Sequence, residues 1–181
     1  AKLRLWLSLV VDEDDIKNIK PLPNLDYKIV CGNSLLGYPY RPMGLDKIEE
    51  LKAQFFNETR PAEKRKIKDQ IDQTIYEQFK NSKRSLGYKV TMDFQINFSE
   101  VFKEKGGFDV VIANPPYVRQ EAIKPLKPHL IKAYRDFFCG TADIYTYFYK
   151  CGVNLLKIGG HLCFIAPNKF MRAGYGKNTR E

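Results

Sequence analysis

The residues whose types and order could do chemistry lie in the middle of the chain, at Asn114, Pro115, Pro116 and Tyr117. Residues 110–114 and their neighbours are mostly apolar and predict a buried parallel strand, which the two consecutive prolines then end. Because neither proline has a backbone N–H, the carbonyl groups around them lack partners in a sheet and can face a ligand. Such rigid acceptors, together with the Asn114 amide and the Tyr117 ring, are what is needed to grip a planar group that bears an NH2.

The order NPPY at residues 114–117 resembles the signature of amino-group methyltransferases that use S-adenosylmethionine, chiefly those that methylate adenine N6 in DNA. Five segments in this order resemble the fused restriction-modification methyltransferases of type IIG: LRLWLSLVVD (3–12), LPNLDYKIVCGNSLLG (22–37), NPPYVRQE (114–121), GTADIYTYFY (140–149) and GGHLCFIAPNKFMRAGYG (159–176). An isolated NPPY is moderately specific, whereas five ordered segments that cover nearly the whole chain are a strong signal.

This resemblance implies an α/β fold, namely part of a Rossmann-like S-adenosylmethionine-dependent methyltransferase domain that spans residues 1–181. It also implies that residues 3–11 form a buried helix packed against the sheet. The family's glycine-rich cofactor loop and acidic ribose-binding residue have no match here, and its last strands and target-recognition domain would follow Glu181. The chain is therefore expected to be an interior fragment that transfers nothing by itself.

The segment before the first glycine-rich turn predicts one more strand. Residues 27–31 alternate and carry β-branched side chains, and Gly32, Asn33 and Ser34 end the run. In an open α/β sheet, ligands bind outside the carboxyl ends of strands, so this turn is expected on the same edge as NPPY. By resemblance, Asn33 and Ser34 belong to the pocket for the cofactor's adenine; a plain Gly-Asn turn is the alternative.

Residues 45–88 have a charged, helical character and are expected to be a helical-hairpin insertion within the domain. Apolar residues recur every three to four positions at Leu45, Ile48, Leu51 and Phe55, and again at Ile67, Ile71, Ile75 and Phe79. Pro61 is expected in the first turn of the second helix. The basic residues between positions 64 and 68 could contact phosphate, or could form an ordinary solvated face.

The segments after NPPY predict a loop, a helix and a strand. Residues 118–138 contain two prolines and no sustained period, which predicts a loop over the active edge. Residues 143–156 predict an aromatic-rich helix, mostly core, ended by the glycines at 159 and 160. Residues 162–166 predict a strand that Pro167 ends. The side chains next along the chain are candidate nucleic-acid contacts, with the start of a surface helix as the alternative: Asn168, Lys169 and Arg172.

Composition limits the classes of partner. The chain has 30 Lys and Arg against 21 Asp and Glu, a net charge of +9, which suits a polyanion such as nucleic acid without proving it. The four cysteines, Cys31, Cys139, Cys151 and Cys163, have neither zinc-ligand nor disulfide spacing and are expected to be buried reduced thiols. The apolar run 3–11 is too short to span a bilayer, so we expect a cytoplasmic protein with no membrane partner.

The resemblance implies transfer of a methyl group from S-adenosylmethionine to the N6 amine of adenine, as part of a restriction-modification enzyme. The oxygens of the Asn114 side chain and the Pro115 carbonyl would each accept one amine hydrogen. Tyr117 would stack on an adenine flipped out of double-stranded DNA. Because the donor sulfur is already positively charged, methyl transfer needs no metal. The remainder of the parent polypeptide would supply the cofactor loop, target recognition and any nuclease.

Two other functions stay open at this point. A methyltransferase that acts on a glutamine amide in a protein release factor shares the NPPY chemistry; residues 45–88, the net charge and residues 168–176 count against it. A non-catalytic nucleic-acid-binding module would use NPPY only as a turn and would bind through its basic helices.

Overall fold

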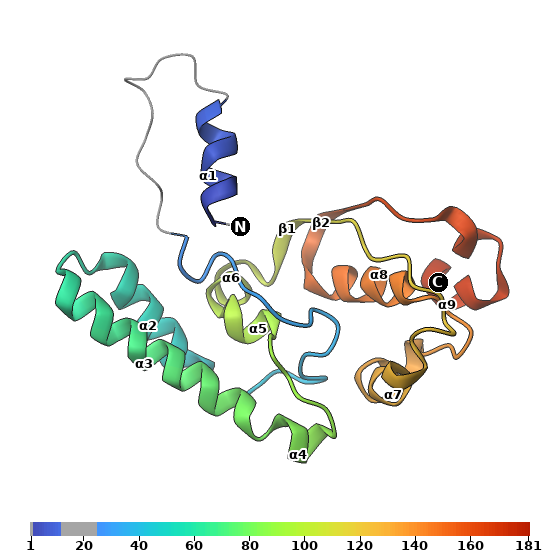
Figure 1. Ribbon diagram of the computed structural model, residues 1–181, viewed down its shortest axis with the longest axis horizontal. Coiled ribbons are helices and arrows are strands. Elements are labelled where there is room, and N and C mark those ends of the chain that lie inside the picture. Colours follow the sequence, from blue (N-terminus) through green and yellow to red (C-terminus); the bar gives the residue numbers. More distant parts are fainter. Residues whose placement is uncertain (1, 12–24) are drawn as a thin grey trace. The chain divides into compact units, whose positions relative to one another are not determined.

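The computed structural model describes residues 2–11 and 25–181, and the chain divides into two units, Ala1–Cys31 and Gly32–Glu181. The first unit contains helix α1, Lys2–Val11 (Figure 1). Leucine and arginine are good helix formers, and the expected helix over residues 3–11 is confirmed. Its packing against the sheet stays a prediction.

The strand expected at residues 27–31 is wrong. A turn occupies this place: the N–H of Lys28 donates to the carbonyl of Leu25 at 3.1 Å, and Tyr27 has a left-handed φ of 61°. Aromatic and β-branched residues favour a strand only where a neighbouring strand and a buried face are present. Among the described residues of this unit there is no strand with which 27–31 could pair.

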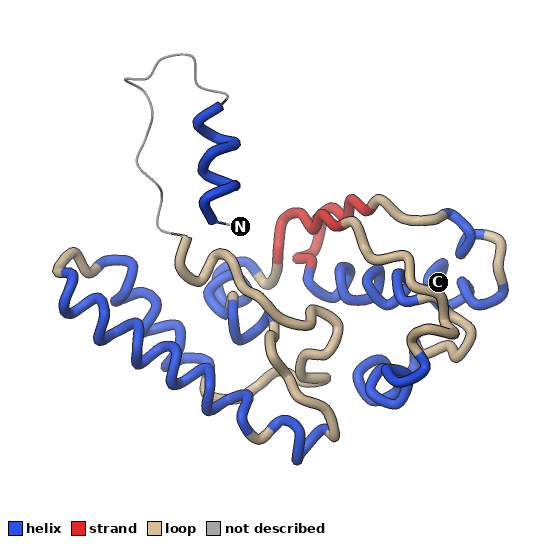
Figure 2. The backbone as a smooth tube through the Cα atoms, in the orientation of Figure 1, coloured by secondary structure: helices blue, strands red, loops and turns tan. Residues whose placement is uncertain are grey.

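The second unit contains a two-stranded parallel sheet, red in Figure 2. Strand β1, Phe108–Ala113, pairs with β2, Leu156–Phe164, and α8, Ile144–Leu155, connects directly into β2. α8 packs on the sheet through Gly152, where a Cβ atom would come within 2.6 Å of Leu162 and 2.9 Å of Phe164. Glycine at this position therefore lets the helix approach the strand closely.

The sheet is covered on one face only by the described elements of its unit. β1 ends before Asn114 and pairs in parallel, as predicted, but its burial was overestimated. Val110 and Ile112 are 51% and 76% exposed, because strand alternation turns them away from α8. Their register partners His161 and Cys163 are exposed on the same face.

β2 begins six residues earlier than expected, directly at the end of α8. The two glycines that were expected to end the helix lie inside the strand, and Gly159 has a φ of +79°. The register passes from Phe108–Leu156 to Val110–His161, so β2 carries extra residues in a bulge. Asp109 pairs with Lys157 in this bulge and with Lys105 at 2.9 Å, and these two ammonium groups lower the pKa of Asp109 to about 2.

The two helices expected in residues 45–88 are confirmed. α2 spans Leu45–Asn57, α3 spans Pro61–Lys80, and the short α4, Ser82–Leu86, follows. The helices α2 and α3 run side by side (Figure 1). Pro61 is the first residue of α3, where its missing N–H costs nothing. The apolar stripe is buried at Leu45, Ile48, Leu51, Phe55 and Ile71. The status of these helices as an insertion stays a prediction.

A buried ion pair joins α2 to the segment that leads into β1. This segment consists of α5, Phe94–Asn97, and α6, Ser99–Lys105. Lys52 of α2 is 1% exposed, and its ammonium group donates to the Asn97 carbonyl at 2.5 Å and to the Glu100 carboxylate at 2.9 Å. Because α6 is followed by β1 after only two glycines, this contact helps to fix where β1 begins.

The loop expected at residues 118–138 is wrong over most of its length. The segment forms a 3₁₀ turn, η2 (Lys124–Leu126), the helix α7 (Lys127–Tyr134) and a second turn, η3 (Arg135–Phe137). Pro125 and Pro128 lie in the first turns of η2 and α7, where proline is tolerated, so they start these elements rather than break them. Ile123 and Leu130 are buried in the main core.

The aromatic helix α8 is mostly core, as predicted. Tyr145 and Tyr147 are each 1% exposed, whereas Val153 is largely exposed. The Tyr147 ring contacts the rings of Tyr134, Phe137 and Phe138. After β2 the chain forms the short turns η4 (Asn168–Met171) and η5 (Gly174–Gly176) and the short helix α9 (Lys177–Arg180).

The four cysteines are free, but their expected burial is wrong for two of them. Cys31 and Cys163 are exposed, and Cys139 and Cys151 are half-buried. Cys163 alternates to the uncovered face of β2, which explains its exposure.

Replacing Lys52 by methionine tests the buried ion pair. Lys52→Met leaves the Glu100 carboxylate without its Lys52 partner in a largely buried place, and we expect the free energy of unfolding to fall by about 3 kcal/mol. Lys66→Met is the matched control, because Lys66 pairs with Glu63 at 2.8 Å on the surface, where solvent screens the pair, and its loss should be much smaller. Urea denaturation measures both, and equal losses would contradict the role given to burial.

Candidate active site

The end of β1 is held by one hydrogen bond to the residue after β2. The N–H of Ile165 donates to the carbonyl of Ala113 at 3.1 Å, which continues the pairing of the two strands by one residue. Asn114 and the two prolines then leave the sheet, as predicted, because proline has no N–H to offer a neighbouring strand. Pro115 is buried, while Asn114 and Pro116 are exposed. The turn thus has a fixed base and an open tip.

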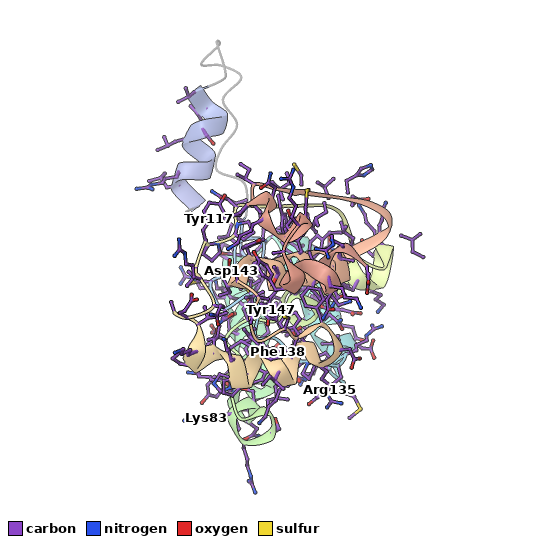
Figure 3. The ribbon with its side chains drawn as sticks, turned by 90° about the vertical axis from the view of Figure 1, so that its right-hand side faces the viewer. Lys83, Tyr117, Arg135, Phe138, Asp143 and Tyr147 are labelled. Carbon is purple, nitrogen blue, oxygen red and sulfur yellow. The ribbon has the colours of Figure 1, made fainter. Side chains whose placement is uncertain are left out.

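Tyr117 returns to this tip and contacts both strand ends. Its hydroxyl lies 3.1 Å from Oδ1 of Asn114 and 3.0 Å from the carbonyl oxygen of Ile165. The structure therefore brings together the two side chains that the sequence singled out at this turn. The Tyr117 ring is 56% exposed, so a large part of its face is open to a ligand. Figure 3 labels Tyr117 in this part of the molecule.

The segment after Tyr117 is fastened to the start of α8, which sequence reasoning missed. The N–H of Gln120 donates to Oδ1 of Asp143 at 3.0 Å, and the N–H of Ile144 donates to the Val118 carbonyl at 3.2 Å. Asp143 is labelled below Tyr117 in Figure 3. The signal available in the sequence was an aspartate directly before a helical run, but this carboxylate bonds the turn instead of capping its own helix.

Asn33 uses its side-chain oxygen within its own turn. Oδ1 accepts from the N–H groups of Leu35 at 3.0 Å and Leu36 at 3.2 Å, and the Asn33 N–H donates to the Thr91 hydroxyl at 3.0 Å. An asparagine that bonds the backbone two and three residues ahead is typical of a turn, as expected if residues 32–33 form only a Gly-Asn turn. The predicted role of Asn33 at the cofactor stays a prediction, with its NH2 as the group that the turn does not use.

Ser34 lies beside β1 in a largely apolar pocket of about 270 Å³. The two residues that precede Asn114, Ile112 and Ala113, line this pocket, so Ser34 and the end of β1 border the same pocket, although no strand ends at Ser34. The other walls are mostly aromatic and aliphatic: Phe94, Phe108, Val110, Val111, Phe148, Cys151, Gly152, Leu155 and Phe164.

A neighbouring pocket of about 280 Å³ shares Ser34 and Phe94 and adds Asp93, which sequence reasoning also missed. The Asp93 carboxylate accepts from the N–H groups of Tyr38 at 2.8 Å, Gln95 at 2.9 Å and Ile96 at 3.1 Å. Burial raises the pKa of Asp93, and these three hydrogen bonds oppose the rise. An aspartate ahead of a short helix is a typical N-cap, which was the signal in the sequence.

Asn168, Lys169 and Arg172 are exposed and line a separate pocket of about 540 Å³ with Met171 and Ala173. Phe170 anchors this turn, because its ring packs 5.0 Å from the Tyr149 ring of α8. The structure thus gathers the three predicted nucleic-acid contacts on η4 and at its end, but none of them lines either of the two pockets that contain Ser34.

Residues 2–11 and 25–181 hold no group of three or more His, Cys, Asp or Glu side chains that could bind a metal ion. No helix in this part of the chain is both long and apolar enough to cross a membrane.

Comparisons with known proteins point mainly to restriction-modification methyltransferases. The model of the family described as Eco57I restriction-modification methylase matches residues 1–181. A protein of Methanocaldococcus jannaschii is named as a type II restriction enzyme and methyltransferase. The two sequences are 25% identical over an alignment 252 residues long, which covers 94% of this chain and 21% of that protein. The type II methyltransferase M.BstVI of Geobacillus stearothermophilus is 40% identical over 77 residues, or 41% of this chain and 13% of its own length.

A relative of another kind matches a shorter part. The release factor glutamine methyltransferase of Clostridium botulinum is 35% identical over 71 residues, which cover 36% of this chain and 25% of that protein. The chain thus spans a quarter or less of each of these three relatives. No solved structure matches the chain.

The raised pKa of Asp93 predicts a dependence of stability on pH. Because the folded state holds this proton more tightly than the unfolded chain, the carboxyl group's contribution to stability is fully present below the unfolded pKa of about 3.9 and is lost as pH rises through the folded pKa. The free energy of unfolding of the wild type, relative to Asp93→Asn, should therefore decline over that range. Urea denaturation at a series of pH values measures this, and a difference that stays constant with pH would contradict it.

Proposed function

The chain belongs to the Eco57I restriction-modification methylase family, and from this premise we propose that its parent protein transfers a methyl group from S-adenosylmethionine to the N6 amine of adenine in DNA. The observation that carries the proposal is the meeting of Asn114 and Tyr117 at the paired ends of β1 and β2. A hydrogen-bond acceptor and an exposed ring at one turn suit a flat substrate that carries an amine.

Asn114 and Pro115 orient the substrate amine in this proposal. The N6 amine of adenine is a poor nucleophile, because its lone pair is delocalised into the ring. Oδ1 of Asn114 and the carbonyl of Pro115 each accept one amine hydrogen, which draws the nitrogen toward a tetrahedral form and directs its lone pair. Burial of Pro115 and its fixed φ support a rigid carbonyl. The catalysis is then one of orientation and preorganised dipoles.

Tyr117 supplies the surface on which the adenine rests. Adenine N6 cannot be reached inside a duplex, so the base has to be flipped out of the stack. The exposed ring of Tyr117 suits stacking with a flipped base, a contact worth about 1–3 kcal/mol in comparable sites.

The residues beside β1 fit the cofactor. The apolar walls of the 270 Å³ pocket include the rings of Phe94 and Phe148, which suit a planar adenine, and Ser34 would supply a polar contact there. Asn33 precedes Ser34 in the chain, and we assign its NH2 to the cofactor as well. When bound, S-adenosylmethionine supplies a methyl group on a positively charged sulfur, and no metal is needed to activate it.

We also propose that double-stranded DNA contacts the exposed turn η4 and the residue that follows it. Asn168, Lys169 and Arg172 are suited to phosphate contact, which the net charge of +9 supports. In this proposal residues 1–181 are part of a Rossmann-like domain with residues 45–88 as its insertion. The remainder of the parent polypeptide supplies the cofactor loop, target recognition and any nuclease, so the fragment alone is inactive.

The second candidate is methylation of a glutamine amide in a release factor. The similarity to the Clostridium botulinum enzyme favours it, and an amide NH2 could be held by the same acceptors. That similarity covers 36% of the chain, whereas the restriction-modification family model covers residues 1–181.

Methyl transfer by the full-length parent protein tests the proposal. Labelled S-adenosylmethionine is offered with unmethylated DNA or with release factor, and wild type is compared with Asn114→Ala. We expect label on DNA adenine and a loss of roughly a hundredfold or more in kcat for Asn114→Ala, because one preorganised hydrogen-bonding group is removed.

Asn57→Ala, at an exposed asparagine at the end of α2, is the matched control and should keep the wild-type rate. Label on release factor in place of DNA would favour the second candidate. Absence of label on both substrates, together with unchanged DNA affinity of Asn114→Ala, would favour a non-catalytic binding module.

A further inference from the structure

The hydroxyl of Tyr117 has one hydrogen and two neighbouring acceptor positions. Oδ1 of Asn114 is 3.1 Å away and the carbonyl oxygen of Ile165 is 3.0 Å away, both within hydrogen-bond range. A hydroxyl donates one hydrogen bond and accepts others. With two oxygens facing it, one of these short contacts would have no hydrogen between its atoms.

The two neighbours differ in whether they can change. The carbonyl of Ile165 can only accept, and the Ile165 N–H fixes its place by bonding Ala113. The amide of Asn114 can turn over, which exchanges its oxygen for its NH2 with little change of shape. Both contacts become hydrogen bonds in one arrangement: the Tyr117 hydroxyl donates to Ile165, and the NH2 of Asn114 donates to the Tyr117 oxygen.

We propose that the Tyr117 hydroxyl is a positioning group that selects this orientation of the Asn114 amide and so leaves Oδ1 free for the substrate amine. This inference rests on the proposed function. In the opposite orientation the NH2 of Asn114 would face the NH2 of the substrate, and two donors cannot bond each other. Tyr117 therefore has two separable roles, because its ring stacks on the base while its hydroxyl sets the acceptor.

Tyr117→Phe in the full-length protein separates the two roles. The variant keeps the ring and loses the hydroxyl, so kcat should fall about tenfold while the KM for DNA and the fluorescence of a 2-aminopurine at the target position, which reports flipping, stay within twofold. Tyr117→Ala is the comparison: it loses the ring as well, and both the KM and the flipping signal should change.

A double-mutant cycle with Asn114→Asp distinguishes orientation of the amide from a general structural effect. A carboxylate has two equivalent oxygens, so it has no orientation to select. Tyr117→Phe should then lower single-turnover methyl transfer less than twofold in the Asn114→Asp background. An equal loss in both backgrounds, or no loss in the wild-type background, would overturn the inference.

A spectroscopic measurement keeps the inference testable if the aspartate variant is too slow to follow. In protein with 15N-labelled asparagine, the side-chain NH2 signal of Asn114, assigned by its absence from Asn114→Ala, should shift in Tyr117→Phe, and its hydrogens should exchange faster with water. An unchanged signal would overturn the inference. Wild-type protein that does not methylate DNA would instead overturn the proposed function, so the two failures are distinguishable.

Discussion

Ile165 makes two hydrogen bonds in opposite directions, and the candidate site depends on both. Its N–H donates to Ala113 at the end of β1, and its carbonyl accepts from Tyr117. The first bond extends the pairing of the two parallel strands by one residue. The second bond holds Tyr117 beside the carboxyl ends of these strands. Asn114 lies in the chain between Ala113 and Tyr117, which both bond Ile165. Its position is therefore fixed by the residue that follows β2 as well as by β1.

The carboxyl ends of β1 and β2 stay in place because other contacts in the unit fix the two strands. α8 approaches β2 closely at Gly152, and its start is bonded to the residues after Tyr117, so one helix contacts both the sheet and the turn. The buried Lys52 connects α2 to the segment before β1. Of the residues that would do the chemistry, Asn114 and Tyr117 are exposed and Pro115 is buried. Lys52 and Gly152, which help to fix the strands, are buried.

Sequence reasoning succeeded where the constraint was local and failed where it was not. Pro115 and Pro116 end a strand whatever surrounds them, and Pro61 starts a helix for an equally local reason. Residues 27–31 have the composition of a strand but form a turn, since strand formation needs a partner that the segment itself cannot specify. Asp143 could be recognised as a helix-start residue, whereas its bond to Gln120, across 23 positions, depends on tertiary structure.

The bulge in β2 lies at the opposite end of the strands from Asn114. Register partners from Val110 to Ala113 follow one another without interruption, while the irregular residues are confined to the stretch between Leu156 and His161. Residues can be inserted or deleted in that stretch by changing the size of the bulge. The strand register beyond the bulge then stays the same. Differences in how α8 joins β2 are thus absorbed before they reach the residues that face the substrate.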